Sequence, residues 1–309
     1  MLLYFIAVGG EHVIKVRVPA TAANIGPGFD CLGVALNIYN DIEVEECNEG
    51  LSINISGERC GDVPVDETNL VYRSMKKVFD VAGFSPKGIR LNQKNGIPIT
   101  RGLGSSAACI VGGMTAANAL AGFPFDKNEL MKMAVEADGH PDNVVPAMMG
   151  GMTAACMEDG EVLYVKIQPP EGIKFAVMIP DIMVKTAKAR KIIPRTIPLE
   201  DAVFNIGRTA VLVASFLTGS TDNLMTATQD RIHQPYRKAL IPHWDEVYSY
   251  SRELGAKGVF LSGSGPTIIA ILDKGYSHFV QQMKVFVSSF EEHWEVRIAD
   301  FCHHGAVTC

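Results

Sequence analysis

Hydrophobic and polar residues alternate along several short stretches of this chain, and such alternation predicts strands that bury one face. The chain therefore opens with β structure once its first dozen residues are passed. One stretch is apolar throughout and has the length of a fully buried strand. The patterns predict strands over residues 14–18, 42–45, 51–56, 162–167, 175–179, 259–261, 267–272 and 296–298.

Between these strands, apolar residues recur at helical spacing. One predicted helix opens at Asp66 and stops at Gly83. Another begins at the capping-box-like pair of Asp126 and Glu129 and ends at Gly139. Further helices are predicted after the glycine-rich turn at residues 102–104, over 205–217 and over 279–290. Because the strands cluster instead of alternating strictly with helices, their order predicts an α+β fold rather than a doubly wound parallel sheet.

Composition narrows the class of protein. At 309 residues and 47 % hydrophobic content, the chain can bury a substantial core and is long enough for two domains. A net charge of −6 disfavours a general nucleic-acid binder, which needs a basic surface to neutralise phosphates. Seven scattered cysteines without a Cys-x-x-Cys pair favour reduced thiols in a cytosolic protein.

The first eight residues are apolar, but they lack the basic start of a signal peptide. They also meet Gly9, Gly10 and Glu11 before a signal-peptide core or a membrane span is complete. We therefore expect no targeting segment and no membrane contact. Since the first strand pattern starts near Val13, residues 1–12 are expected to lie outside the folded core.

A glycine-rich turn directly before an unusually small-sided helix is the strongest chemical signal in the chain. Glycines let the backbone approach a phosphate closely, and the first free N–H groups of the helix would point at that phosphate. The two serines that follow add hydroxyl groups for phosphate and Mg²⁺ contacts. The segment consists of Pro98, Ile99, Thr100, Arg101, Gly102, Leu103, Gly104, Ser105, Ser106, Ala107 and Ala108.

Two other interpretations of this turn stay open on its own residues. The spacing of Gly102, Gly104 and Ala107 satisfies a relaxed dinucleotide-binding fingerprint, and Asp126 lies about where the ribose-binding acid is expected. The turn could also be purely structural. Its late position, after several strands, counts against dinucleotide binding. No Walker lysine follows any glycine loop, which excludes an ordinary P-loop.

Two further glycine-rich segments are ambiguous when each is taken alone. Residues 19–36 place Asn24 and Asp30 in a loop after the first strand, where they could carry function or merely cap a tight turn. Residues 258–267 are most simply a tight connection between paired strands. Their Gly-Ser-Gly-Pro sequence, which lacks bulk, would also let the backbone support a phosphate loop or a substrate.

Taken together, the three segments resemble, in order and separation, the three motifs of the GHMP kinases, which include galactokinase and the homoserine, mevalonate and phosphomevalonate kinases. Residues 98–107 reproduce the middle motif, Pro-x-x-x-Gly-Leu-Gly-Ser-Ser-Ala, which wraps the ATP phosphates in that family. The resemblance implies an N-terminal ribosomal-protein-S5-like domain at 13–155 and a C-terminal ferredoxin-like α/β domain at 156–309.

Within the family, four segments are similar to signatures of the homoserine kinases: residues 19–36, 140–151, 186–190 and 233–237. The resemblance implies ATP-dependent phosphorylation of L-homoserine to O-phospho-L-homoserine in threonine biosynthesis, with ATP and Mg²⁺ as cofactors. It also implies a cytoplasmic protein and a homodimer. One departure is that the family's Glu-x-Glu-Gly-His is here Glu136-Ala-Asp138-Gly-His140, which keeps Glu136 but puts any role of Asp138 in doubt.

The resemblance also assigns roles to individual residues. Homoserine is a zwitterion with a hydroxyl group, so its recognition needs an acid for the ammonium and an arginine fork for the carboxylate. The implied ligands are Asn24 and Asp30 for the amino group, Arg190 and Arg237 for the carboxylate, Thr186 and His140 near the hydroxyl, Ser105 and Glu136 for Mg²⁺, and Asn69 for adenine.

Asn143 lies where mevalonate kinases are thought to use an aspartate, and an amide cannot act as a base. We therefore predict direct transfer, in which the hydroxyl proton passes to phosphate or water and Asn143 only orients the reacting groups. His140 is the second candidate for handling the proton, since an imidazole titrates near neutral pH.

Plainer interpretations of these residues stay open. Glu136 could be a solvated helix residue, Arg190 part of a basic surface run, and Asn69 a residue of a helix's first turn. Another small alcohol such as mevalonate would be favoured if Arg190 and Arg237 proved dispensable. A non-catalytic nucleotide-binding regulator would be favoured if the protein bound ATP without phosphorylating any of these alcohols.

Overall fold

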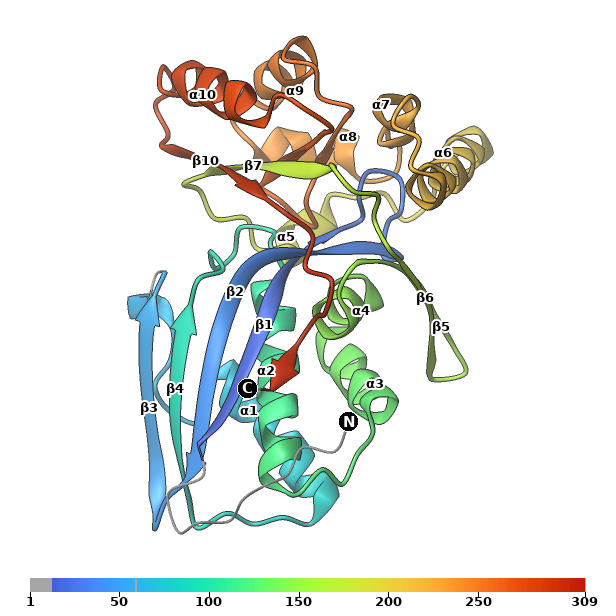
Figure 1. Cartoon of the computed structure of the whole chain (residues 1–309). Coiled ribbons are helices and arrows are strands. Elements are labelled where there is room, and N and C mark those ends of the chain that lie inside the picture. The colour runs from blue at the N-terminus through green and yellow to red at the C-terminus, as the bar shows by residue number, and fades with distance from the viewer. Residues whose placement is uncertain (1–12, 59, 309) are drawn as a thin grey trace.

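The computed structural model describes residues 13–58 and 60–308, so the extension predicted at residues 1–12 lies outside the described residues. Two sheets organise the molecule, the larger in the lower part of Figure 1 and the smaller at its top. The larger sheet has seven strands in the order β11-β1-β2-β4-β3, with β5 paired to β2 and β6 to β5. Its strands are β1 (Ile14–Ala23), β2 (Leu32–Glu46), β3 (Gly50–Gly57), β4 (Gly88–Asn95), β5 (Met152–Glu158), β6 (Glu161–Ile167) and β11 (Val307–Thr308).

Four helices accompany this sheet: α1 (Leu70–Ala82), α2 (Ser105–Leu120), α3 (Lys127–Asp138) and α4 (Pro141–Met149). Helix α2 lies at the centre of this half and is buried on almost every side. Its small residues allow this packing, because a Cβ atom on Gly112 would lie 2.3 Å from Ile42 and one on Gly113 would lie 2.4 Å from the carbonyl oxygen of Val71. Each glycine costs about 1 kcal/mol in helix propensity, which the close packing offsets.

The smaller sheet is antiparallel and has the order β10-β7-β9-β8. Its strands are β7 (Lys174–Pro180), β8 (Gly258–Leu261), β9 (Ile268–Leu272) and β10 (Trp294–Ala299). The helices of this half are α5 (Thr186–Lys191), α6 (Leu199–Thr218), α7 (Leu224–Ala227), α8 (Gln234–Arg237), α9 (Trp244–Glu253) and α10 (Tyr276–Val287). Within the described residues, α6 alone is long and apolar enough to cross a membrane by length and composition, a test that core helices also pass.

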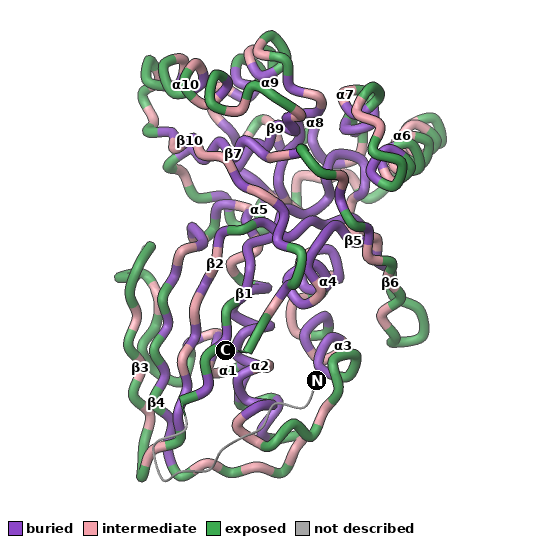
Figure 2. The backbone as a smooth tube through the Cα atoms, viewed as in Figure 1, coloured by how far each residue is buried: buried purple, intermediate pink, exposed green. Residues whose placement is uncertain are grey.

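Strand β7 is buried on both faces, which accounts for its unbroken apolar sequence (Figure 2). Phe175, Val177 and Ile179 join the core shared with the larger sheet. Ala176 and Met178 point the other way, into a second core beneath α9 and α10. Successive side chains alternate across a strand, so one strand supplies both cores.

The predicted α+β class and most predicted elements are confirmed, and the differences have local causes. Each predicted strand overlaps an observed one, and the predicted capping box opens α3. Helix α1 begins at Leu70 instead of Asp66 because Asn69 caps it, whereas the Asp66 carboxylate accepts hydrogen bonds from Thr68. The elements that were not predicted are strands β4, β5 and β11 and helices α4, α5, α7, α8 and α9.

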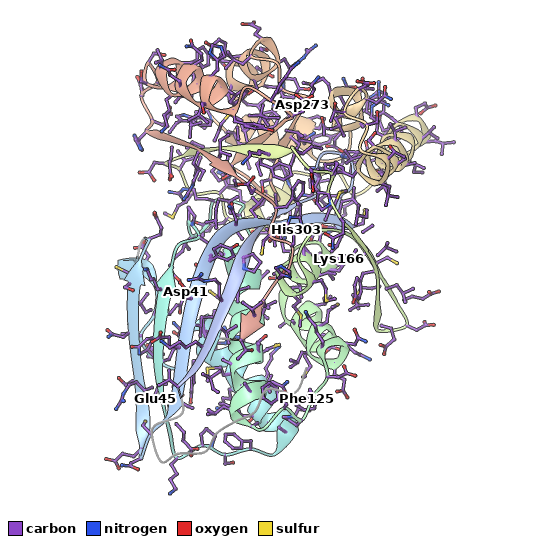
Figure 3. The ribbon with its side chains drawn as sticks, in the orientation of Figure 1. Asp41, Glu45, Phe125, Lys166, Asp273 and His303 are labelled. Carbon is purple, nitrogen blue, oxygen red and sulfur yellow. The ribbon has the colours of Figure 1, made fainter. Side chains whose placement is uncertain are left out.

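The larger sheet extends past the boundary predicted at residue 155, because both β5 and β6 belong to it. The end of the chain also returns there, where Thr308 pairs with Val16. Lys166 of β6 donates to the carbonyl oxygen of His303 at 2.6 Å, and Figure 3 shows these two residues together. The chain therefore crosses between the halves more than once, and the division into domains 13–155 and 156–309 stays a prediction.

Candidate active site

A cavity of about 480 Å³ lies between the two halves of the molecule and takes residues from both. The first glycine-rich segment contributes Asn24 and Asp30 to its wall, and the third contributes Gly263 and Ser264. The middle segment contributes most of its residues: Ile99, Thr100, Arg101, Gly102, Gly104, Ser105, Ser106 and Ala107. Three segments far apart in sequence therefore meet at one site.

The middle segment forms a tight turn at the N-terminus of α2. Gly104 occupies the N-cap position with φ 67°, and a Cβ atom there would lie 1.9 Å from the Thr21 hydroxyl. Ser105 and Ser106 are the first two residues of the helix, so free N–H groups and hydroxyls face the cavity together. This arrangement suits an anion such as a phosphate group.

Three residues of the predicted cofactor segment do not line the cavity. Pro98 is buried beside it, and Leu103 and Ala108 belong to the hydrophobic core. They support the turn through packing, and the neighbouring residues of the segment face the cavity.

The structure does not bring Glu136 into the site. Glu136 is exposed on α3 and does not line the cavity, whereas Asp138 does. The Asp138 carboxylate accepts a hydrogen bond from the side chain of Ser106. Burial raises the pKa of Asp138 to about 6, and the bond from Ser106 opposes that shift. The acid beside the serine pair is therefore Asp138, the residue at which the sequence departs from the family pattern.

Asn69, predicted to contact adenine, does not line the cavity either. Its side-chain oxygen accepts the Val71 and Tyr72 N–H groups, and its amide nitrogen donates to the carbonyl oxygen of Pro64 at 2.9 Å. Asn69 thus caps α1 and holds the segment around Pro64, which does line the cavity. The residues near Asn69 in sequence or in contact with α1 and α2 that do line the cavity are Asp62, Val63, Pro64, Thr68, Leu70, Gln93 and Cys109.

An ion pair forms another part of the cavity wall. The Arg190 guanidinium donates to both carboxylate oxygens of Asp30, at 3.0 and 2.8 Å. His140 Nε2 lies 3.9 Å from the same carboxylate. Burial lowers the pKa of His140, and Arg190 lowers it further while Asp30 opposes the shift. All three side chains line the cavity.

Arg237 is a buried cation beside this pair. It donates to the carbonyl oxygens of Ala189 and Gly263, at 3.2 and 2.9 Å. Within residues 13–58 and 60–308, no carboxylate lies in ion-pair contact with it. Burial and the charge of Arg190 lower the pKa of Arg237 to about 10. A buried guanidinium without an anionic partner favours binding of an anion.

Three more predicted residues line the cavity and are held by internal hydrogen bonds. The Asn24 amide donates to Gly263 and its oxygen accepts the Asp30 N–H, so both ends of the side chain are engaged. The Asn143 side-chain oxygen accepts the Thr21 hydroxyl at 2.7 Å. Thr186 lies at the start of α5, with its hydroxyl 3.3 Å from that of Ser264.

Comparison with known proteins identifies the family. Residues 69–151 match the GHMP kinases N-terminal domain and residues 212–283 match the GHMP kinases C-terminal domain. The chain is 52 % identical over 293 residues to the homoserine kinase of Petrotoga mobilis, which covers 95 % of both proteins. The chain belongs to the GHMP kinase family.

Other homoserine kinases resemble this GHMP kinase over 95 % or more of its length. The enzyme of Caldicellulosiruptor saccharolyticus is 50 % identical, over 95 % of this chain and 96 % of its own. The crystal structure of homoserine kinase from Cytophaga hutchinsonii superposes with a TM-score of 0.89 at 32 % identity and covers 100 % of both chains. The predicted GHMP fold is therefore confirmed.

In this GHMP kinase the third glycine-rich segment contacts and supports the glycine-rich turn at the start of α2. The Ser262 hydroxyl donates to the carbonyl oxygen of Gly102 at 2.6 Å. A Cβ atom on Gly102 would lie 2.4 Å from the Ser262 carbonyl oxygen, so the two segments can approach this closely because Gly102 has no side chain. The segment that was ambiguous alone thus forms the floor of the turn.

Sequence reasoning missed Asp142, a buried carboxylate in the wall of this kinase's cavity. Burial, followed by the charges of Asp30 and Asp138, raises the pKa of Asp142 to about 7. The residue lies beside Asn143 in the family signature, but its burial depends on α4, which the sequence did not predict. Sequence reasoning also missed the wall residues around Pro64, because they come from a loop without a motif.

Proposed function

We propose that this GHMP kinase transfers the γ-phosphoryl group of ATP to the hydroxyl of L-homoserine and releases O-phospho-L-homoserine and ADP. The observation that carries the proposal is a single cavity lined both by an anion-binding helix start and by Asp30, Arg190 and Arg237. The relatives named above support the choice of homoserine. The proposed product belongs to threonine biosynthesis.

The charged end of the cavity is matched to an amino acid zwitterion. Asp30 and Arg190 neutralise each other. Arg237 is a second cation, and its described partners are uncharged. A substrate carboxylate between Arg190 and Arg237 would satisfy that cation, and the ammonium would then take the place of Arg190 at Asp30. Asn24 would act by fixing the Asp30 backbone, since both ends of its amide are engaged.

The part of the cavity at the start of α2 fits the phosphates of ATP and a magnesium ion. The Ser105 and Ser106 hydroxyls and the Asp138 carboxylate are hard oxygen donors of the kind that Mg²⁺ prefers. Among the described residues no group of three or more His, Cys, Asp or Glu could hold a metal. When bound, Mg²⁺ would neutralise charge on the ATP phosphates.

Transfer requires the hydroxyl to be held in line with the γ-phosphate, and the protein's contribution is positioning. Asn143, fixed by Thr21, would orient the hydroxyl, with Thr186 and His140 nearby. An amide cannot accept the hydroxyl proton as a base. The proton would therefore pass to phosphate or water.

An assay of ADP release with L-homoserine, mevalonate and galactose tests the proposal. We expect release only with homoserine, and we expect Arg190→Ala and Arg237→Ala to raise its KM at least about tenfold while the KM for ATP changes little. Faster turnover with mevalonate, or arginine variants that behave like wild type, would favour another alcohol kinase. ATP binding without turnover of any alcohol would favour a non-catalytic regulator.

Two further expectations follow from the family. The protein is expected to act in the cytoplasm and to form a homodimer in solution. Light scattering on the purified full chain measures the second directly, and a monomer at working concentration would contradict it. The −6 net charge supports the absence of a nucleic-acid partner.

A further inference from the structure

A fully buried histidine, His233, lies behind the amino acid end of the cavity without lining it. It precedes α8, and its ring stacks on Phe29 with centroids 5.3 Å apart. The turn that holds it is fixed by Asp230, whose carboxylate accepts the backbone N–H groups of Ile232, His233 and Gln234 at 2.6–2.9 Å. The imidazole therefore has a well-defined position.

The two ring nitrogens of His233 contact opposite sides of the site. Nε2 lies 2.7 Å from the carbonyl oxygen of Gly26, in the loop that carries Asp30. Nδ1 lies 3.3 Å from Nη1 of Arg237. A carbonyl only accepts hydrogen bonds and a guanidinium only donates them, so the proton must be on Nε2 and the lone pair on Nδ1. These contacts require a neutral imidazole.

Burial of the ring favours the same neutral state. Asp230 and Asp30 attract a proton to His233, and Arg237 repels it. Burial outweighs the two carboxylates and lowers the pKa of His233 to about 4. The acceptor at Nδ1 therefore persists at neutral pH.

The orientation of the Arg237 guanidinium is fixed by the acceptors to which its N–H groups donate. The two N–H groups of Nη1 go to His233 and to the carbonyl oxygen of Gly263, and the Nε N–H goes to Ala189. Across residues 13–58 and 60–308, Nη2 has no hydrogen-bond partner, and Arg237 lines the cavity. One edge of the guanidinium is thus held and the other is left for a ligand.

We propose that His233 is a positioning residue that couples the two sides of the amino acid site. It accepts from Arg237 on one side and donates to the Asp30 loop on the other, so the cation and the carboxylate keep a fixed separation. This inference rests on the proposed function, because it takes Arg237 as the partner of the substrate carboxylate.

Two variants separate hydrogen bonding from packing. His233→Phe keeps a ring against Phe29 but has neither donor nor acceptor, whereas His233→Gln keeps one of each. We expect the phenylalanine variant to raise the KM for homoserine about tenfold or more, with kcat and the KM for ATP within about threefold of wild type. Glutamine should restore most of the loss. His243→Phe, which removes a histidine stacked on Phe290, is the matched control and should behave like wild type.

A double-variant cycle with Arg237→Met distinguishes positioning from a merely structural role. If His233 acts through Arg237, adding His233→Phe to Arg237→Met should raise the KM for homoserine no further. Additive effects, an equal rise in the KM for ATP, or no effect of His233→Phe would overturn the inference. If wild type itself releases no ADP with homoserine, the proposed function fails, and this outcome is separate from any result on His233.

A third variant covers the case in which His233→Phe does not fold. His233→Asn keeps an acceptor near Arg237 but is too short to reach Gly26. Because the contact with the Asp30 loop is lost, its KM for homoserine should rise about three- to tenfold, and a KM equal to that of wild type would overturn the coupling of the two sides.

Discussion

Asp138 and Glu136 show how far residue chemistry could be predicted from the sequence. Both acids lie on α3, and the family pattern favoured Glu136. Asp138 lies four residues after Ala134 and eight after Leu130, on the buried stripe of the helix, so its side chain reaches the cavity. Glu136 falls on the opposite side and is exposed. Helical geometry could have decided between them, but the motif alone could not.

Changing these two acids separately tests the assignment. Asp138→Asn should raise the Mg²⁺ concentration needed for half-maximal activity by about 10- to 100-fold, because it removes the charged oxygen donor beside Ser106. Glu136→Gln, two residues away, should leave the Mg²⁺ dependence unchanged. The measurement is a Mg²⁺ titration of ADP release at fixed ATP. The reverse pattern would return the metal-binding role to Glu136.

Asp142 should make the stability of the protein depend on pH. Its pKa is raised from an ordinary value of 3.8 to about 7, so the folded state resists its ionisation. The free energy of unfolding should therefore fall as pH rises from about 4 to about 7 and stay level above that. Asp142→Asn removes the ionisation, so the variant should be more stable than wild type at pH 8, by about 4 kcal/mol at most.

Urea unfolding of both proteins between pH 5 and pH 8 measures this difference. Asp138 also has a raised pKa, so its ionisation likewise lowers the free energy of unfolding as pH rises. The Asp142→Asn variant should therefore keep part of the pH dependence of stability. A variant that is less stable than wild type at pH 8 would show that the Asp142 carboxylate is ionised and satisfied in the folded state.

The start of α2 is the element on which both ligand sites depend. Its turn fits only because Gly104 lacks a side chain where Thr21 approaches, and Thr21 in turn holds Asn143. The sequence predicted this turn well, since glycines and serines before a helix have a local physical meaning. It could not predict that Thr21, 83 residues before Gly104, would limit the space, because that contact exists only in the folded molecule.

Replacing Gly104 or Gly122 by alanine distinguishes two costs. One is backbone strain at positive φ, and the other is a clash between the added Cβ atom and a neighbouring side chain. Both glycines have positive φ, 67° and 83°, but a Cβ atom on Gly122 meets nothing within 4 Å. Gly122→Ala should therefore cost only about 1–2 kcal/mol of stability, with normal kinetics. Gly104→Ala should cost more and also lower kcat/KM, because Thr21 and Asn143 must move. Urea unfolding and steady-state kinetics measure the two effects, and equal behaviour of the variants would contradict the close-contact explanation.

At the scale of the whole molecule, the two halves are joined by contacts that local sequence patterns do not predict. The class and the order of elements follow from periodicity, which is local. The return of the chain end to β1 and the pairing of β5 with β2 are non-local, with no signal in any short segment. The β5 pairing also brings β6, its hairpin partner, into the larger sheet. One hydrophobic core also runs from the larger sheet into β7, where Phe301 packs edge-on against Phe175 at 4.7 Å.

This shared core leads us to expect that the two halves unfold together. Both tryptophans, Trp244 and Trp294, belong to the second core, so their fluorescence reports on the smaller sheet, whereas far-UV circular dichroism reports on the whole chain. The two signals should give the same urea midpoint, as in a single cooperative transition. Phe301→Ala should lower stability by about 3 kcal/mol and shift both midpoints equally, since it opens a cavity between the sheets. Fluorescence that changes at a different urea concentration from circular dichroism would mean that the halves fold as independent units despite the contacts that join them.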